Sequence, residues 1–180
     1  MKRLLFVYIL FMCMLSGCSG PENPVNASWK SWDVVARKLA RQFGQRYLSS
    51  GTGLLVGGGL WDYSVVDHRQ MTLPEGRKLV AEMLQTTLNQ TLKDPIYQEY
   101  LRSQNMLYDS EILTSKFGIK IAFWNENVDR PLFPYLAQIR AAEGKVYFYY
   151  ADPETQALQE PAAEIVSYQE LIGNLKEANQ

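Results

Sequence analysis

Charge of one sign is nowhere concentrated in this sequence. The 180 residues include 18 lysines and arginines and 19 aspartates and glutamates, and the two signs are mixed along the chain. A nucleic-acid-binding protein carries a basic face or tail, and a segment that binds anionic lipid carries a basic cluster. We therefore expect no nucleic-acid partner and no polybasic membrane contact.

Long hydrophobic runs are also absent. The run from Leu4 to Leu15 has about twelve residues, whereas a membrane-spanning helix needs about 20. It follows the basic pair Lys2 and Arg3 and precedes small residues, which is the order of a cleaved export signal. The sequence predicts that residues 1–17 are a signal peptide.

The end of this segment, Leu15-Ser16-Gly17-Cys18, resembles the lipobox of bacterial lipoproteins. In that family the cysteine thiol receives a diacylglycerol, signal peptidase II cuts before the cysteine, and the new amino group often gains an acyl chain such as palmitate. The resemblance implies lipidation at Cys18 and a membrane partner in the cell envelope. An ordinary secretory signal with a chance cysteine is the alternative.

The residue after the cysteine, Ser19, is not an aspartate. In enterobacteria this resembles the pattern of lipoproteins sorted to the outer membrane, so the resemblance implies the outer membrane rather than the inner one, with the domain in the periplasm. Each buried methylene of an acyl chain contributes about 0.8 kcal/mol, and two or three chains would hold the protein almost permanently.

The mature chain would have no free thiol, because Cys13 leaves with the signal peptide and Cys18 carries lipid. This excludes a reactive-cysteine enzyme, a disulfide and a cysteine metal site. We expect no cofactor. Residues 18–27 are rich in turn formers and are interpreted as the lipidated cysteine and a flexible tether, and residues 28–180 as a single domain.

Hydrophobic spacings of three and four residues predict helices. Thr72 and Glu75 form a capping box at the start of one helix, and Ser167 and Glu170 form another at the start of the last. The expected helices are residues 29–48, 72–92, 96–102 and 167–176.

Alternating patterns and turn signals predict strands, of which Phe117 to Trp124 is the clearest. The others are a strand within residues 51–64 and a hairpin of residues 135–142 and 145–150. We expect an α+β domain, with a small antiparallel sheet of about four strands and helices packed on one face. The order of elements, with Phe-Gly-Ile-Lys-Ile and Lys-Val-Tyr-Phe-Tyr-Tyr-Ala-Asp-Pro, resembles small lipoproteins of chlamydia-related bacteria, which implies no activity or site.

Glycines at positions 51, 53 and 57–59 suggest a phosphate-binding loop, but the details disagree. A P-loop requires Lys followed by Ser or Thr after its last glycine, and here Leu60 and Trp61 follow. In the dinucleotide fingerprint, Val56 occupies the place of the third glycine. A strand with a bulge or a close backbone approach is the preferred interpretation.

Candidate catalytic and metal-binding residues are few. His68 follows Asp67, and Ser64 is close in sequence, but adjacent strand residues point apart and no nucleophile elbow is present. We interpret His68 as a polar loop residue. Carboxylates are the only ligands left for a metal, and the pairs that could hold calcium weakly are Asp62 with Asp67 and Glu126 with Asp129.

The residues from Tyr147 to Tyr150 are all aromatic. Strand alternation places Tyr147 and Tyr149 on one face and Phe148 and Tyr150 on the other. One set should enter the core, and the other is either a partner surface or a set of cross-strand pairs that stabilise the sheet.

Three functions remain as hypotheses. The leading one is a membrane-anchored, non-enzymatic binding or assembly module that engages another envelope protein. The alternatives are an envelope hydrolase that uses carboxylates or His68, and a carrier of a small amphiphile with a cavity between sheet and helices.

Overall fold

A computed structural model describes residues 24–51, 61–103, 116–124 and 129–177 of the chain. These residues form a six-stranded sheet with the strand order β1-β2-β3-β4-β5-β6. The strands are Arg46–Gly51 (β1), Trp61–Asp67 (β2), Phe117–Phe123 (β3), Gln138–Ala142 (β4), Lys145–Tyr149 (β5) and Glu164–Ser167 (β6).

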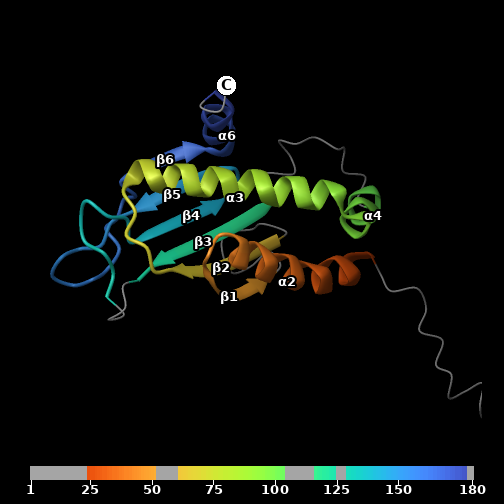
Figure 1. The fold of residues 1–180 in the computed structure, drawn as a ribbon, viewed down its shortest axis with the longest axis horizontal. Helices are drawn as coiled ribbons and strands as arrows, with labels where there is room; N and C mark the ends of the chain where they lie inside the picture. Colours follow the sequence, from red (N-terminus) through yellow and green to blue (C-terminus); the bar gives the residue numbers. More distant parts are fainter. Residues whose placement is uncertain (1–23, 52–60, 104–115, 125–128, 178–180) are drawn as a thin grey trace, which may run out of the picture.

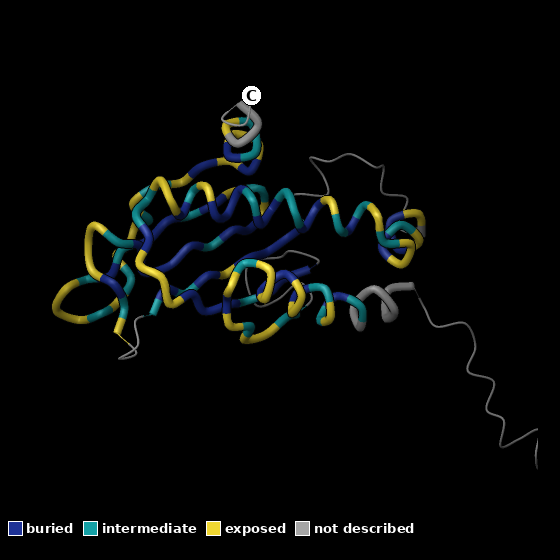
Figure 2. Tube along the Cα trace, in the orientation of Figure 1, coloured by how far each residue is buried: buried dark blue, intermediate teal, exposed yellow. Residues whose placement is uncertain are grey.

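The described helices are Pro24–Gln42 (α2), Leu73–Lys93 (α3), Pro95–Ser103 (α4) and Tyr168–Glu177 (α6). In Figure 1, α2 and α3 lie across the same side of the sheet, and α6 follows the edge strand β6. The α+β class and the covering of one sheet face by α2 and α3 agree with the sequence prediction. Figure 2 shows that the central strands are mostly buried, whereas the helices alternate between buried and exposed residues.

Aromatic side chains fill the space between α2, α4 and the sheet. Trp32 of α2 packs against Trp61, Tyr63 and Phe117 with ring centroids 5.9 to 6.3 Å apart. Its indole N–H donates to the backbone oxygen of Asp62 at 3.0 Å. Burying one such side chain contributes about 1.5–3 kcal/mol, so this cluster fixes α2 on the sheet.

The sheet differs from the prediction in size and in direction. It has six strands rather than about four, and β2 pairs with β3 in parallel while all other pairs are antiparallel. The predicted strands lie close together in the sequence, which favours antiparallel neighbours, so the parallel pair was not predicted. The helices α3 and α4 form the crossover that parallel neighbours require.

The helix predicted over residues 29–48 is wrong at its carboxyl end. The helix α2 ends at Gln42, Gly44 adopts a positive φ of 68°, and residues from Arg46 onward form β1. Gly44 ends the helix because glycine readily adopts this positive-φ conformation. Tyr47 lies beyond the helix and continues the helical spacing of apolar residues only by coincidence.

The other predicted helices are confirmed. The backbone N–H of Thr72 donates to the Glu75 carboxylate at 2.8 Å at the start of α3. The backbone N–H of Glu170 donates to the Ser167 hydroxyl at 3.1 Å at the start of α6. Both contacts satisfy polar groups that would otherwise be unpaired at helix starts.

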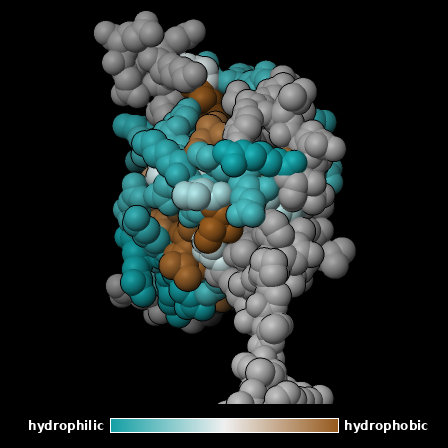
Figure 3. Space-filling view, turned by 90° about the vertical axis from the view of Figure 1, so that its right-hand side faces the viewer, coloured by the Kyte–Doolittle hydropathy of each residue, from teal (hydrophilic) through white to brown (hydrophobic). Residues whose placement is uncertain are grey.

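The first described helix begins at Pro24, within the segment interpreted as a tether. This start and α4 lie at one end of the molecule in Figure 1, and the carboxyl ends of β2 and β3 point to the opposite end. Viewed from the α4 end, the described surface is mostly hydrophilic with smaller hydrophobic patches (Figure 3). Among the described residues, no helix is long and apolar enough to cross a bilayer.

The parallel strands approach each other closely at Gly118. A Cβ atom built on Gly118 would lie 2.0 Å from an Oδ1 atom of Asp62, whose side chain is buried. We predict that Gly118→Ala lowers the free energy of unfolding by about 1–3 kcal/mol, because a methyl group cannot fit without movement of β2. Urea unfolding of the purified protein measures this.

A matched control is Gly173→Ala in α6, where an added Cβ meets nothing within 4 Å. This change should raise stability by about 0.5–1 kcal/mol through helix propensity. Equal stability of Gly118→Ala and wild type would show that β2 and β3 are not packed in this way.

Candidate binding site on the open face of the sheet

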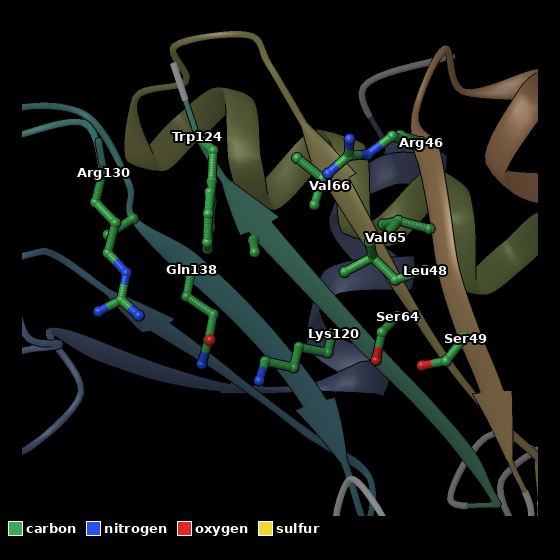
Figure 4. Close-up of a pocket in the computed structure, with 12 residues that line it drawn as sticks. Arg46, Leu48, Ser49, Ser64, Val65, Val66, Lys120, Trp124, Arg130 and Gln138 are labelled. Carbon is green, nitrogen blue, oxygen red and sulfur yellow. The ribbon is translucent and has the colours of Figure 1, made fainter. Parts of the chain in front are cut away.

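The face of the sheet opposite α2 and α3 carries a hollow of about 350 Å³. We call it the cationic hollow (Figure 4). It is lined by Arg46, Leu48, Ser49, Ser64, Val65, Val66, Lys120, Ala122, Trp124, Arg130, Ala137 and Gln138.

Strand alternation produces the floor of the cationic hollow. Phe117, Ile119 and Ile121 of β3 are buried in the core, so the residues between them face the other side of the sheet. The side chain of Lys120 therefore stands over the open face, with Ala122 next along the same strand. In register, Val66 lies opposite Ala122, and Ala122 lies opposite Gln138. The short side chain of Ala122 leaves a depression among longer neighbours.

One wall of the hollow comes from the edge strand β1. Arg46 is in register with Val66, and the pairing shifts between Tyr47 and Ser49, which marks a bulge at Leu48. A bulge redirects side chains. Leu48 is half exposed and lines the hollow beside Ser49. The guanidinium of Arg46 extends toward Val66 in Figure 4.

A polar network holds β1 against α2. The carboxylate of Asp33 accepts hydrogen bonds from the hydroxyl of Tyr47 and from the Ser50 hydroxyl at 2.9 Å. Its second oxygen accepts from Nε of Arg37 at 2.8 Å, and the Arg37 guanidinium lies 4.3 Å from the centre of the Tyr47 ring. Hydrogen bonds from Arg37 and Tyr47 lower the pKa of Asp33 to about 2.

The opposite wall comes from the loop after β3. Arg130 is fixed by two contacts with Gln156: its backbone N–H donates to the side-chain oxygen at 3.1 Å, and Nη1 donates to the backbone oxygen at 2.7 Å. The backbone N–H of Trp124 donates to the backbone oxygen of Asp67 at 3.1 Å, which keeps the chain beside β2 after β3 ends. In Figure 4 the Trp124 indole lies between Arg130 and Val66.

The charged residues that line the cationic hollow are all basic, whereas the chain as a whole is nearly neutral. Three of its lining residues are basic, Arg46, Lys120 and Arg130, and none is acidic, although the net charge of the chain is −1. Arg46 and Lys120 are exposed and form no ion pair with a described carboxylate. The nearest acidic neighbour in sequence, Asp129, lines an adjoining hollow with Arg130. The arrangement is suited to binding anionic groups.

The structure does not assemble a catalytic triad from the sequence candidates. Ser64 lies on the open face, whereas His68 is exposed and its Nδ1 lies 3.1 Å from the backbone oxygen of Trp124. Burial opposes ionisation of Asp67, but hydrogen bonds from Arg69 and Gln45 outweigh it and lower its pKa. Asp67 thus binds these two side chains and makes no described contact with His68.

The carboxylate pairs suggested for calcium receive no support. No group of three or more His, Cys, Asp or Glu residues in the described parts of the chain is arranged to hold a metal ion. Asp62 and Asp67 are both buried, and Asp67 is held by Arg69. Glu126 and the glycines at positions 53 and 57–59 lie outside the described residues.

The aromatic run divides between the two faces as alternation predicts. Phe148 enters the core, and Tyr147 and Tyr149 face the open side, with Tyr147 half-buried and Tyr149 buried. Tyr147 is in register with Arg140 and with Ile165 of the edge strand. Tyr150 follows β5 and packs against Phe133 with ring centroids 5.3 Å apart. None of the four lines the cationic hollow.

Sequence reasoning missed the basic residues of the hollow. The predicted helix over residues 29–48 includes Arg46, and no predicted element covers Arg130. The alternation of residues 117–124 does place Lys120 opposite the buried side chains, so this residue was accessible to prediction. The pairing of β1 with β2 joins residues more than ten positions apart in the sequence, and it could not be predicted from local patterns.

Comparison with protein families, with curated proteins and with solved structures finds no match to this chain. Inferences about function therefore rest on the contacts and charges of the described residues.

The Asp33 network predicts a pH dependence of stability. The pKa of Asp33 is about 2 in the folded protein against 3.8 as a reference, so its stabilising effect is present above about pH 4 and is lost as the pH falls toward 2. Asp33→Asn should lower stability at pH 7 by about 0.5–1 kcal/mol, since the group is partly exposed. The difference in stability between Asp33→Asn and wild type should become smaller below pH 4.

Thermal unfolding of both proteins from pH 7 to pH 2 measures this difference. Glu99→Gln, which alters an exposed carboxylate of α4 outside the network, serves as the control. A constant difference between Asp33→Asn and wild type across the whole range would contradict the ionised network.

Proposed function

We propose that this protein is a lipid-anchored envelope lipoprotein whose folded domain is a non-enzymatic binding module, with the cationic hollow as its binding surface. The observation that carries the proposal is the cluster of Arg46, Lys120 and Arg130 on the sheet face opposite α2 and α3. Arg46 and Lys120, which form no ion pair with a described carboxylate, border a recessed apolar floor. Such an arrangement is a feature of recognition sites rather than of fold stability.

Two features favour binding over the alternative functions. Asp67 and His68, the candidate pair of a histidine-dependent hydrolase, contact Arg69 and Trp124 instead of each other. The space between α2 and the sheet, where a carrier would hold an amphiphile, is filled by the cluster of aromatic rings around Trp32.

The proposed anchor is compatible with access to the hollow. With lipid on Cys18, the six residue steps to Pro24 reach at most about 20 Å, so the start of α2 would stay near the bilayer. Val66 and Ala122 lie near the carboxyl ends of β2 and β3, which point away from that end of the molecule (Figure 1). With the anchor at that end, the proposal has the hollow facing the periplasmic space and its proteins.

The anchor predicts the mass of the protein isolated from membranes. Wild type should lack residues 1–17 and carry added acyl mass, and Cys18→Ala should lose both the acyl mass and the membrane association. Intact-mass spectrometry of the membrane fraction measures this. Cys13→Ala is the matched control and should behave as wild type.

An unlipidated mass with cleavage at another position would refute the anchor. It would leave the proposed binding surface in place on a secreted domain, so the two parts of the proposal are tested separately.

The binding surface predicts where a partner crosslinks in cells. A photo-reactive residue at Ala122, on the floor of the hollow, should form a discrete crosslinked product. The same residue at Lys78, an exposed position of α3, should not. Addition of Lys120→Glu to the Ala122 probe should weaken the product, because it reverses a charge beside the probe. Equal crosslinking from Lys78 and Ala122, or insensitivity to Lys120→Glu, would contradict the assignment.

A further inference from the structure

The basic groups of the cationic hollow surround an apolar floor. Val66, Ala122 and Ala137 form the floor, with Trp124 beside them and Leu48 on the β1 side. Figure 4 shows Arg46 and Arg130 on opposite sides of the hollow, with Lys120 toward the amino end of β3. A complementary ligand has anionic groups at its two ends and an apolar group between them.

The strand register gives the approximate width of the hollow at the level of the backbone. Arg46, Val66, Ala122 and Gln138 form one row across β1 to β4. Neighbouring strands lie about 4.8 Å apart, so the row spans about 14 Å. Arg130 lines the hollow beside Gln138. An extended chain rises about 3.3 Å per residue, so carboxylates four residues apart match this span.

We propose, on the basis of the proposed function, that the hollow binds an extended acidic segment of a partner protein. The segment carries two carboxylates four residues apart with an apolar residue midway. In an extended chain, alternate residues point to the same side, so all three side chains face the sheet. The carboxylates meet Arg46 and Arg130, and the apolar side chain enters the depression over Ala122.

The fixed position of Arg130 favours a carboxylate ligand. Its Nη1 is held by the backbone oxygen of Gln156, which orients the guanidinium and leaves its other N–H groups for paired hydrogen bonds. Planar guanidinium groups bind carboxylates in this way. Lys120 adds a further positive charge on a long, flexible type of side chain.

A protein segment fits better than a lipid surface. Membrane binding favours apolar groups that protrude, whereas the apolar residues here form the floor of a hollow. The hollow also lies toward the end of the sheet away from the start of α2, which follows the proposed anchor (Figure 1).

The test uses the lipidated protein in phosphatidylcholine nanodiscs and the fluorescent peptide Ser-Glu-Thr-Leu-Thr-Glu-Ser. Fluorescence anisotropy should show saturable binding with a Kd below about 1 mM at low salt. Because the contacts are ionic and partly exposed, binding should weaken about tenfold or more in 0.5 M salt. A peptide with both glutamates changed to glutamine should bind at least about tenfold more weakly.

A third peptide, Ser-Glu-Thr-Leu-Glu-Thr-Ser, has the same composition and charge. Its second carboxylate points away from the sheet in an extended chain, so its affinity should fall about fivefold or more if the spacing is recognised. Equal affinity of the two glutamate peptides would refute the proposed geometry.

Variants of the protein locate the site. Arg46→Glu and Lys120→Glu change exposed side chains and should each weaken binding of the glutamate peptide about tenfold. Lys78→Glu on α3 changes net charge equally and should leave the affinity unchanged. The Arg46→Glu variant should gain affinity for a peptide in which one glutamate is changed to lysine, because the lysine then meets the new carboxylate while the remaining glutamate still meets Arg130, a rescue that misfolding cannot produce.

Two further results would overturn the inference, besides equal affinity of the two glutamate peptides. One is no saturable binding of the glutamate peptide at about 1 mM. The other is preferential binding of phosphatidylglycerol vesicles that is lost in Lys120→Glu, which would assign the hollow to a lipid surface. If either result occurs while crosslinks from Ala122 persist in cells, the proposed function stands and only the acidic segment is refuted.

Discussion

The packing of α2 and α3 against one side of the sheet requires strands whose side chains alternate. On β3 the sequence Phe-Gly-Ile-Lys-Ile-Ala-Phe sends its phenylalanines and isoleucines into the core and leaves Lys120 and Ala122 on the other side. Each fully buried apolar side chain contributes about 1.5–3 kcal/mol, so the register cannot slip by one residue without losing the core. The same constraint that builds the core therefore fixes which residues form the cationic hollow.

The parallel pairing of β2 and β3 is the second constraint on the site. It places the carboxyl ends of both strands at one edge, where Asp67 and Trp124 are joined by a backbone hydrogen bond. The loop that follows β3 then returns Arg130 to the open face, where Gln156 holds it. The position of Arg130 thus depends on contacts between residues distant in the sequence. The position of Arg46 depends on the Asp33 network that holds β1 on α2.

Local patterns predicted the local features of the fold. The capping box of α3, the contact of Ser167 with the start of α6, the alternation of β3 and the hairpin of β4 and β5 follow from neighbouring residues, and each is confirmed. The strand β1 and the parallel pair were missed because they depend on partners distant in sequence, and because Tyr47 extends the helical spacing of α2. Of the hollow, only the side on which Lys120 stands could be predicted, since Arg46, Trp124 and Arg130 meet through tertiary structure.

The central claim is that the open face of the sheet, and not its helical face, binds an anionic partner. The most direct measurement is the map of backbone amide chemical shifts of the mature protein in micelles as the glutamate peptide is added. The account predicts saturable shifts that concentrate at Arg46, Val66, Ala122 and Gln138. Shifts confined to the exposed residues of α3 and α6, or no saturable shifts, would contradict it.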